Sequence, residues 1–183
     1  LLRGDGVHVF DQGDVAQVLR EIFQPNSAVR AVKLTPAHIN VLPELAIKTT
    51  SVEVVIVGGE PLTRRHVEIL KELNGSIKVY NEYGPTEATI GCVVYDTDEG
   101  IATDSVPIGR SIANSYVYVL NEWMGLQPQG SRGELWIGGV PLAAGDQVTR
   151  PITPIPATSC RIEPVVSPPR LPALPGRQGG RFN

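Results

Sequence analysis

The chain has 183 residues, of which 42% are hydrophobic and 19% charged, with a formal net charge of −3 at pH 7. This is enough for one domain with a buried core, and the charge indicates neither a nucleic-acid partner nor a membrane surface. The two cysteines, Cys92 and Cys160, are far apart and have no metal-ligand spacing, so the sequence supports neither a disulfide framework nor a zinc site, and we expect a cytoplasmic protein. The start of the chain has no signal-peptide pattern and no initiator methionine, which indicates a segment of a longer chain.

The first half of the chain alternates predicted strands and helices. Asp14, with Gln17 three residues later, is typical of a helix N-terminus, as is Thr35 followed by Pro36. The strands recur roughly every two dozen residues, so we predict an α/β fold with a parallel sheet and flanking helices. The predicted strands span residues 6–10, 29–34, 52–57 and 76–80, and the predicted helices span residues 15–24, 36–45 and 63–73.

Three loops leave the carboxyl ends of these predicted strands, at residues 33–36, 58–61 and 81–87. In an open α/β sheet, ligands bind beyond the carboxyl ends of the strands, so we expect the three loops to converge on one site. The paired glycines Gly58 and Gly59 would let a flat ring approach the backbone, although they are equally typical of a tight turn.

The third loop, Asn-Glu-Tyr-Gly-Pro-Thr-Glu at residues 81–87, carries the most chemistry. The ring of Tyr83 can stack on a base, and Gly84 with Pro85 fixes a turn. Thr86 offers a hydroxyl to a phosphate oxygen, and Glu87 offers a carboxylate to Mg²⁺. The alternative is an ordinary exit from a strand with its usual turn residues.

Beyond residue 87 strands follow strands without helices, at residues 88–95, 116–121 and 133–137. This pattern predicts a small antiparallel β subdomain. We expect an α/β portion over residues 1–105, the start of the β subdomain over residues 106–142 and a tail over residues 143–183.

Residues 81–87 resemble the fifth core motif of adenylation domains of nonribosomal peptide synthetases, members of the adenylate-forming (AMP-binding) superfamily that also contains acyl-CoA synthetases and luciferases. Pro85 favours the peptide-synthetase branch. Several motifs that agree in order are stronger evidence than one, and the resemblance covers about residues 1–142. The other similar stretches are residues 34–36, 57–60, 106–110 and 133–139, the last resembling the sixth core motif.

The resemblance implies a ligase that joins an amino acid to ATP as an aminoacyl adenylate, and then loads it on the phosphopantetheine thiol of a carrier domain. Peptidyl carrier and condensation domains of the same assembly line are the implied partners. The motifs imply that Asn81 and the Gly59 backbone contact adenine, Tyr83 stacks on it, and Thr86 and Glu87 are catalytic, Glu87 as the Mg²⁺ ligand. The implied nucleotide-binding set is Gly58, Gly59, Glu60, Pro61, Asn81, Glu82, Tyr83, Gly84 and Thr86.

The resemblance also identifies substrate-pocket positions. Lys33 and Glu82 are the informative pair, because a carboxamide satisfies both: its oxygen accepts from Lys33 and its NH₂ donates to Glu82. We therefore expect asparagine as the substrate, aspartate second and glutamine third; the alternative is a Lys33–Glu82 salt bridge across an otherwise apolar pocket. The pocket positions are Lys33, Ile56, Gly58, Glu82, Ile90 and Gly91.

The family pattern is lost after about residue 142. Residues 151–183 contain eight of the sixteen prolines, so we expect a disordered tail, and a reading-frame shift explains it better than a natural proline-rich tail. The family's upstream phosphate loop and the aspartate at the pocket entrance have no counterpart in the chain. Its downstream ribose-binding aspartate and C-terminal lysine are likewise without one, so we expect the chain alone to be inactive.

Two further functions stay open: an acyl-CoA ligase, which an apolar tunnel in place of Lys33 and Glu82 would support, and a non-catalytic nucleotide- or partner-binding module. The module would be favoured if Tyr83 and its loop pointed away from Gly58 and Gly59. The remaining conspicuous side chains are interpreted as structural, Cys92 as a small buried one. These are His8, His38, His66, Tyr116, Tyr118 and Trp136.

Overall fold

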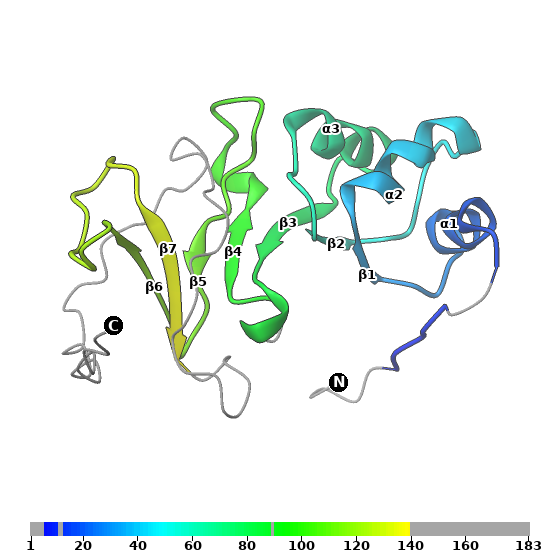
Figure 1. The fold of residues 1–183 in the computed structure, drawn as a ribbon. Helices are drawn as coiled ribbons and strands as arrows, with labels where there is room; N and C mark the ends of the chain where they lie inside the picture. Colours follow the sequence, from blue (N-terminus) through cyan, green and yellow to red (C-terminus); the bar gives the residue numbers. More distant parts are fainter. Residues whose placement is uncertain (1–5, 11–12, 89, 140–183) are drawn as a thin grey trace, which may run out of the picture.

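The computed structural model describes residues 6–10, 13–88 and 90–139 (Figure 1). Its larger sheet has five strands in the order β1-β2-β3-β4-β5, and its smaller sheet pairs β6 with β7. The first three strands are parallel, as predicted, and the last two of the larger sheet are antiparallel. The strands are β1 (Ala31–Leu34), β2 (Val54–Gly58), β3 (Lys78–Tyr83), β4 (Val93–Asp96), β5 (Arg110–Ser111), β6 (Ser115–Leu120) and β7 (Glu134–Gly139).

The three predicted helices are confirmed as α1 (Val15–Phe23), α2 (Pro36–Val41) and α3 (Arg64–Leu73), with the 3₁₀ turn η1 (Leu42–Leu45) continuing α2. Thr35 is the N-cap of α2 and Pro36 its first residue, as expected from proline's fixed φ. Asp14 precedes α1, but the side-chain capping box predicted with Gln17 does not form. Instead the backbone carbonyl of Asp14 accepts from the N–H groups of Gln17 and Val18 at 2.9 and 3.0 Å.

Two strand predictions were wrong. Residues 6–10 form no strand, and Val7 and Val9 are 65% and 73% exposed, because no described strand pairs with them. The fourth predicted strand does not stop at Tyr80 but continues to Tyr83, so Asn81, Glu82 and Tyr83 belong to β3 and not to a loop. The extension is held on both sides, since Asn81 lies opposite Val57 of β2 and Tyr95 of β4.

The strand expected over residues 88–95 is shorter than predicted. A 3₁₀ turn, η2 (Thr86–Ala88), occupies its start, and β4 begins only at Val93; a further turn, η3 (Thr97–Glu99), follows β4. The predicted antiparallel pairing of the last two strands is confirmed in β6 and β7. Their conspicuous aromatics lie on the strands, Tyr116 38% exposed and Tyr118 and Trp136 half-buried. The expected tail, residues 143–183, lies outside the described residues, and the boundaries near residues 106 and 143 stay predictions.

The two faces of the parallel strands differ sharply. One face carries Val55, Val57 and Val79, all 0% exposed, in a core that includes Leu19, Ile39 and Leu70 from the three helices. Figure 1 shows α2 and α3 lying together along one side of β1, β2 and β3. The other face carries side chains that are exposed or half-buried, and among the described residues no helix covers it; they are Ala31, Lys33, Val54, Ile56, Lys78 and Tyr80.

A second, smaller core lies between β4 and the two-stranded sheet. Ala88 and Cys92, from the turns before β4, pack with Ile108, Leu135 and Ile137. The loop that follows β3 is therefore fixed from behind by the small sheet.

Candidate functional site

The ends of the three parallel strands lie side by side, as the sequence predicted. Gly58 of β2 lies opposite Glu82 of β3, and a Cβ atom at Gly58 would be 2.8 Å from the Glu82 carbonyl oxygen. Gly59 has φ +90°, and a Cβ atom there would be 3.7 Å from Cγ2 of Thr35, in the loop after β1. Each position therefore requires glycine for a structural reason. At Gly58 the neighbouring strand is too close for a side chain, and at Gly59 the backbone has a positive φ. It also leaves this edge free of side chains from β2.

The carboxamide of Asn81 links β3 to a distant segment. The side chain is 5% exposed, and Nδ2 donates to the carbonyl oxygens of Val106 and Pro107 at 3.3 and 2.8 Å. Carbonyl oxygens only accept, so the NH₂ group must face them, which orients Oδ1 the other way. The predicted adenine contact of Asn81 would therefore use Oδ1 as an acceptor.

Residues 103–107 connect the loop after β2 to Asn81, a role that no pattern in the sequence indicates. The Val106 N–H donates to the Leu62 carbonyl at 2.9 Å, and the Arg64 N–H donates to the Asp104 carbonyl at 2.7 Å. The segment thus holds the loop after β2 on one side and Asn81 on the other. In the sequence it carried only a family resemblance at residues 106–110, without a chemical role.

The loop after β3 doubles back on itself. The Cys92 N–H donates to the Tyr83 carbonyl at 3.0 Å, and the Ile90 N–H donates to the Pro85 carbonyl at 3.2 Å. Ile90 adopts φ +72°, which is uncommon for a β-branched residue. A Cβ atom at Gly84 would be 2.4 Å from the Ile90 carbonyl oxygen, so the loop closes only around a glycine.

The predicted catalytic residues lie in this loop. Thr86 is exposed at the start of η2, whereas the side chain of Glu87 lies outside what the structure describes. Tyr83, at the end of β3, is half-buried against the second core. Within the described part of the chain no group of three or more His, Cys, Asp or Glu side chains could hold a metal ion.

Five of the six predicted pocket residues come together on the open face of the sheet. Lys33 forms an ion pair with Glu82, and Ile56 lies next to Lys33 on the neighbouring strand. Gly91 makes room for the Glu82 side chain, because a Cβ atom there would be 2.4 Å from Cδ. The sixth pocket residue, Ile90, is 61% exposed.

The ion pair is open to solvent. The Lys33 side chain is 49% exposed and that of Glu82 is 18% exposed. The structure thus contains the Lys33–Glu82 salt bridge that was the alternative interpretation of the sequence. A pair this exposed contributes about 1 kcal/mol or less to folding, so its two charges remain available for a polar ligand.

Cys92 belongs to the second core and is 0% exposed, which confirms the prediction of a small buried side chain. Burial, with a smaller contribution from the Glu82 carboxylate, raises the pKa of the Cys92 thiol to about 11. The thiol therefore stays protonated at neutral pH and is no nucleophile.

The three histidines have structural partners. His8 stacks on Phe10 with ring centroids 4.3 Å apart. His38 and His66 accept hydrogen bonds at the starts of α2 and α3. The signal for these caps was visible in the sequence as Thr-x-x-His, present at both 35–38 and 63–66, but only Thr35 had been identified as a cap.

The chain is similar to several known proteins. The chain is 38% identical over 148 residues to bacitracin synthase 3 of Bacillus licheniformis, and 38% identical over 147 residues to tyrocidine synthase 3 of Brevibacillus parabrevis. Each match covers 79% of this chain but only 2% of the relative. A solved NRPS protein containing adenylation and PCP domains is similar with a TM-score of 0.62 and 26% identity, over 74% of this chain and 28% of that one.

No helix in the described residues has the length and apolar character to cross a membrane. The family model for AMP-binding enzymes matches residues 1–145, most of the chain. On this evidence the chain belongs to the AMP-binding enzyme family.

Proposed function

We propose that the chain is the middle segment of an amino-acid-activating adenylation domain of a nonribosomal peptide synthetase. The observation that carries the proposal is the meeting of three strand ends beside the Lys33–Glu82 ion pair. A nucleotide at those ends would have its phosphates next to an amino acid held by the pair. The family, and the synthases to which the chain is similar, support this chemistry.

The nucleotide would be held by the loops after β2 and β3. The glycine pair leaves space for a flat base, the Tyr83 ring would stack on it, and Oδ1 of Asn81 would accept from its amino group. Thr86, which is exposed, would donate its hydroxyl to the α-phosphate. Mg²⁺, held in part by Glu87, would neutralise charge on the phosphates.

The reaction has two steps. A carboxylate oxygen of the amino acid bonds to the α-phosphorus of ATP and pyrophosphate leaves, which gives the aminoacyl adenylate. The thiol of a phosphopantetheine group on a partner carrier domain then displaces AMP and leaves the amino acid as a thioester. Holding the reactants in line and stabilising charge on the phosphoryl oxygens are the protein's main contributions to such chemistry.

Asparagine is the substrate that fits the ion pair best. In a bound carboxamide the oxygen would accept from Lys33 while the NH₂ group donates to Glu82, so neither charge loses a partner when the two are separated. Aspartate would satisfy Lys33 but would be repelled by Glu82, and it is the second candidate. Glutamine, which is one methylene longer, is the third.

Amino-acid-dependent ATP–pyrophosphate exchange, measured in a complete adenylation domain that contains this segment, tests the substrate. Asparagine should exceed aspartate in kcat/KM, and Glu82→Gln should shift the ratio toward aspartate by roughly tenfold, since the repulsion is removed. Lys78→Met is the control. Lys78 is an exposed lysine on the same face of the sheet, opposite Val54 and outside the predicted pocket, so its replacement should leave the asparagine-to-aspartate ratio unchanged. A wild-type preference for aspartate would refute the asparagine assignment.

The other two functions are less well supported. An acyl-CoA ligase would carry an apolar tunnel where this chain has a charged pair. A non-catalytic module is disfavoured because Glu82 lies opposite Gly58 and Tyr83 follows it at the end of β3, which brings the loop after β3 to the edge that carries the glycine pair.

We expect the 183-residue chain alone to give no pyrophosphate exchange above background. The face of the sheet that bears Lys33 and Glu82 is uncovered in the described residues, so water is not excluded from the pair. Robust turnover by the chain alone would overturn this part of the proposal.

A further inference from the structure

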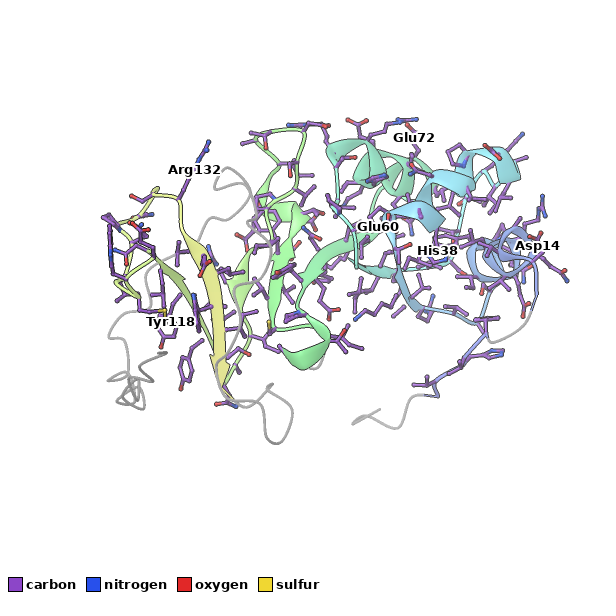
Figure 2. The ribbon with its side chains drawn as sticks, viewed as in Figure 1. Asp14, His38, Glu60, Glu72, Tyr118 and Arg132 are labelled. Atoms are coloured by element: carbon purple, nitrogen blue, oxygen red, sulfur yellow. The ribbon has the colours of Figure 1, made fainter. Side chains whose placement is uncertain are left out.

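Two histidines occupy equivalent positions at the candidate site. Each is the third residue of the helix that follows a parallel strand, His38 in α2 after β1 and His66 in α3 after β2. In both, the backbone N–H of the N-cap threonine donates to the Nδ1 atom of the ring at 3.1 Å. The threonine Oγ1 lies 2.9 Å from Nδ1 in the first case and 3.0 Å in the second. Figure 2 marks His38 on α2 and Glu60 in the loop before α3.

The hydrogen bonds determine the protonation state of both rings. A backbone N–H can only donate, so Nδ1 must accept, and the ring proton must lie on Nε2. Each imidazole is therefore neutral in this arrangement. A glutamate or glutamine usually fills this capping role. Histidine differs from both because it gains a proton near physiological pH and then has no acceptor.

The two capped loops are also the loops of the candidate nucleotide site. Thr35, capped by His38, lies 3.7 Å from the position that a Cβ atom of Gly59 would occupy. Thr63, capped by His66, lies two residues beyond the 58–61 loop and forms a β-bridge with Ser105 of the 103–107 segment. Both caps therefore adjoin the edge where the strands end.

We propose that His38 and His66 are positioning residues that hold the loops after β1 and β2 through neutral Nδ1 atoms, so that these loops lose their order when the rings are protonated. The inference rests on the proposed function only in treating these loops as the nucleotide-binding edge. A protonated ring would also place positive charge at the start of a helix, where the helix dipole disfavours it.

The surroundings of His66 are mixed in charge. Glu60 in the preceding loop and Asp104 in the 103–107 segment are acidic, whereas Arg64 and Arg65 on α3 are basic. The neighbouring helix α2 carries His38 as its titratable residue. Burial, which outweighs the two carboxylates, lowers the pKa of His66 below 6.5. Because the unfolded chain then takes up the proton first, stability contributed by this cap is present above pH 6.5 and declines as the pH falls below it.

Amide hydrogen exchange of the chain by NMR, at pH 7.5 and pH 5.5, tests the proposal. Protection of the Thr35 and Thr63 amides, corrected for the intrinsic pH dependence of exchange, should fall about five- to tenfold at the lower pH. The double variant His38→Gln, His66→Gln keeps an acceptor at each cap but cannot titrate, so its protection should be independent of pH. His8→Gln, which removes a histidine outside the caps, should behave as wild type.

Three results would overturn the proposal: pH-dependent protection in the double glutamine variant, unchanged protection in the wild type, or a ring proton on Nδ1 in the ¹⁵N spectrum at pH 7.5. The last measurement uses the wild type, so it remains decisive if a variant does not fold. ATP added to the same samples tests the proposed function separately. If ATP perturbs no loop resonance at either pH, the nucleotide site is refuted in this chain, while exchange at the two caps still decides the role of the histidines.

Discussion

The two faces of the parallel strands have different roles: one contributes most to folding, and the other carries the candidate pocket. On the face covered by the helices, Val55, Val57 and Val79 are fully buried, and burial of such apolar side chains is the main source of folding free energy. On the open face lie Lys33 and Glu82, two charges that contribute little to folding because water screens them. Adjacent residues of one strand therefore have different roles. Val57 packs in the hydrophobic core, and Ile56 lines the candidate pocket.

The largest expected effect comes from placing the same charge on each face in turn. Val57→Asp would bury a carboxylate without a partner and should cost about 3–5 kcal/mol of the free energy of unfolding. Ile56→Asp, the matched variant, puts the carboxylate on the open face beside Lys33 and should cost about 1 kcal/mol or less. Urea denaturation measures both, and equal losses would contradict the division between the faces.

A smaller loss of stability is expected from replacing the two glycines beside the pocket, one packed against backbone atoms and the other against the Glu82 side chain. Gly84→Ala forces a Cβ atom against the backbone of Ile90 and Cys92 and should cost roughly 2–3 kcal/mol. Gly91→Ala clashes only with the Glu82 side chain, which can rotate away, and should cost about 1 kcal/mol or less while it breaks the pair with Lys33. The free energies of unfolding of the two variants give the test; a larger loss for Gly91→Ala would show that Glu82 is held rigidly.

The last prediction concerns the low reactivity of the Cys92 thiol and its small effect on stability. Because its pKa is raised from 9.0 to about 11, alkylation at pH 8 should be about 100-fold slower in the folded chain than in urea. The same shift means that the unfolded thiol ionises first, so stability should decline as the pH rises above 9.0. Mass mapping of the Cys92 peptide distinguishes it from Cys160, and rapid labelling in the folded state would show that the second core opens.

The histidine caps illustrate where prediction from the sequence ran short. Thr35 was recognised as a cap because a proline followed it, whereas Thr63 lacks that signal and His38 and His66 are not the residues expected three positions later. The family resemblance predicts that Lys33 and Glu82 line the substrate pocket. The open face on which it lies was not anticipated, because helix positions along a chain do not say which side of a sheet they cover.

The sequence by itself determined the three helices, the three parallel strands and the motif at the end of the last of them, because these depend on local apolar spacing and on turn residues. Only the tertiary structure decided that β3 continues through Tyr83, that Asn81 binds the carbonyls of Val106 and Pro107, and that Lys33 pairs with Glu82. Each of these features depends on contacts with another strand or with a segment more than twenty residues away in the sequence. Local sequence patterns carry no information about such contacts.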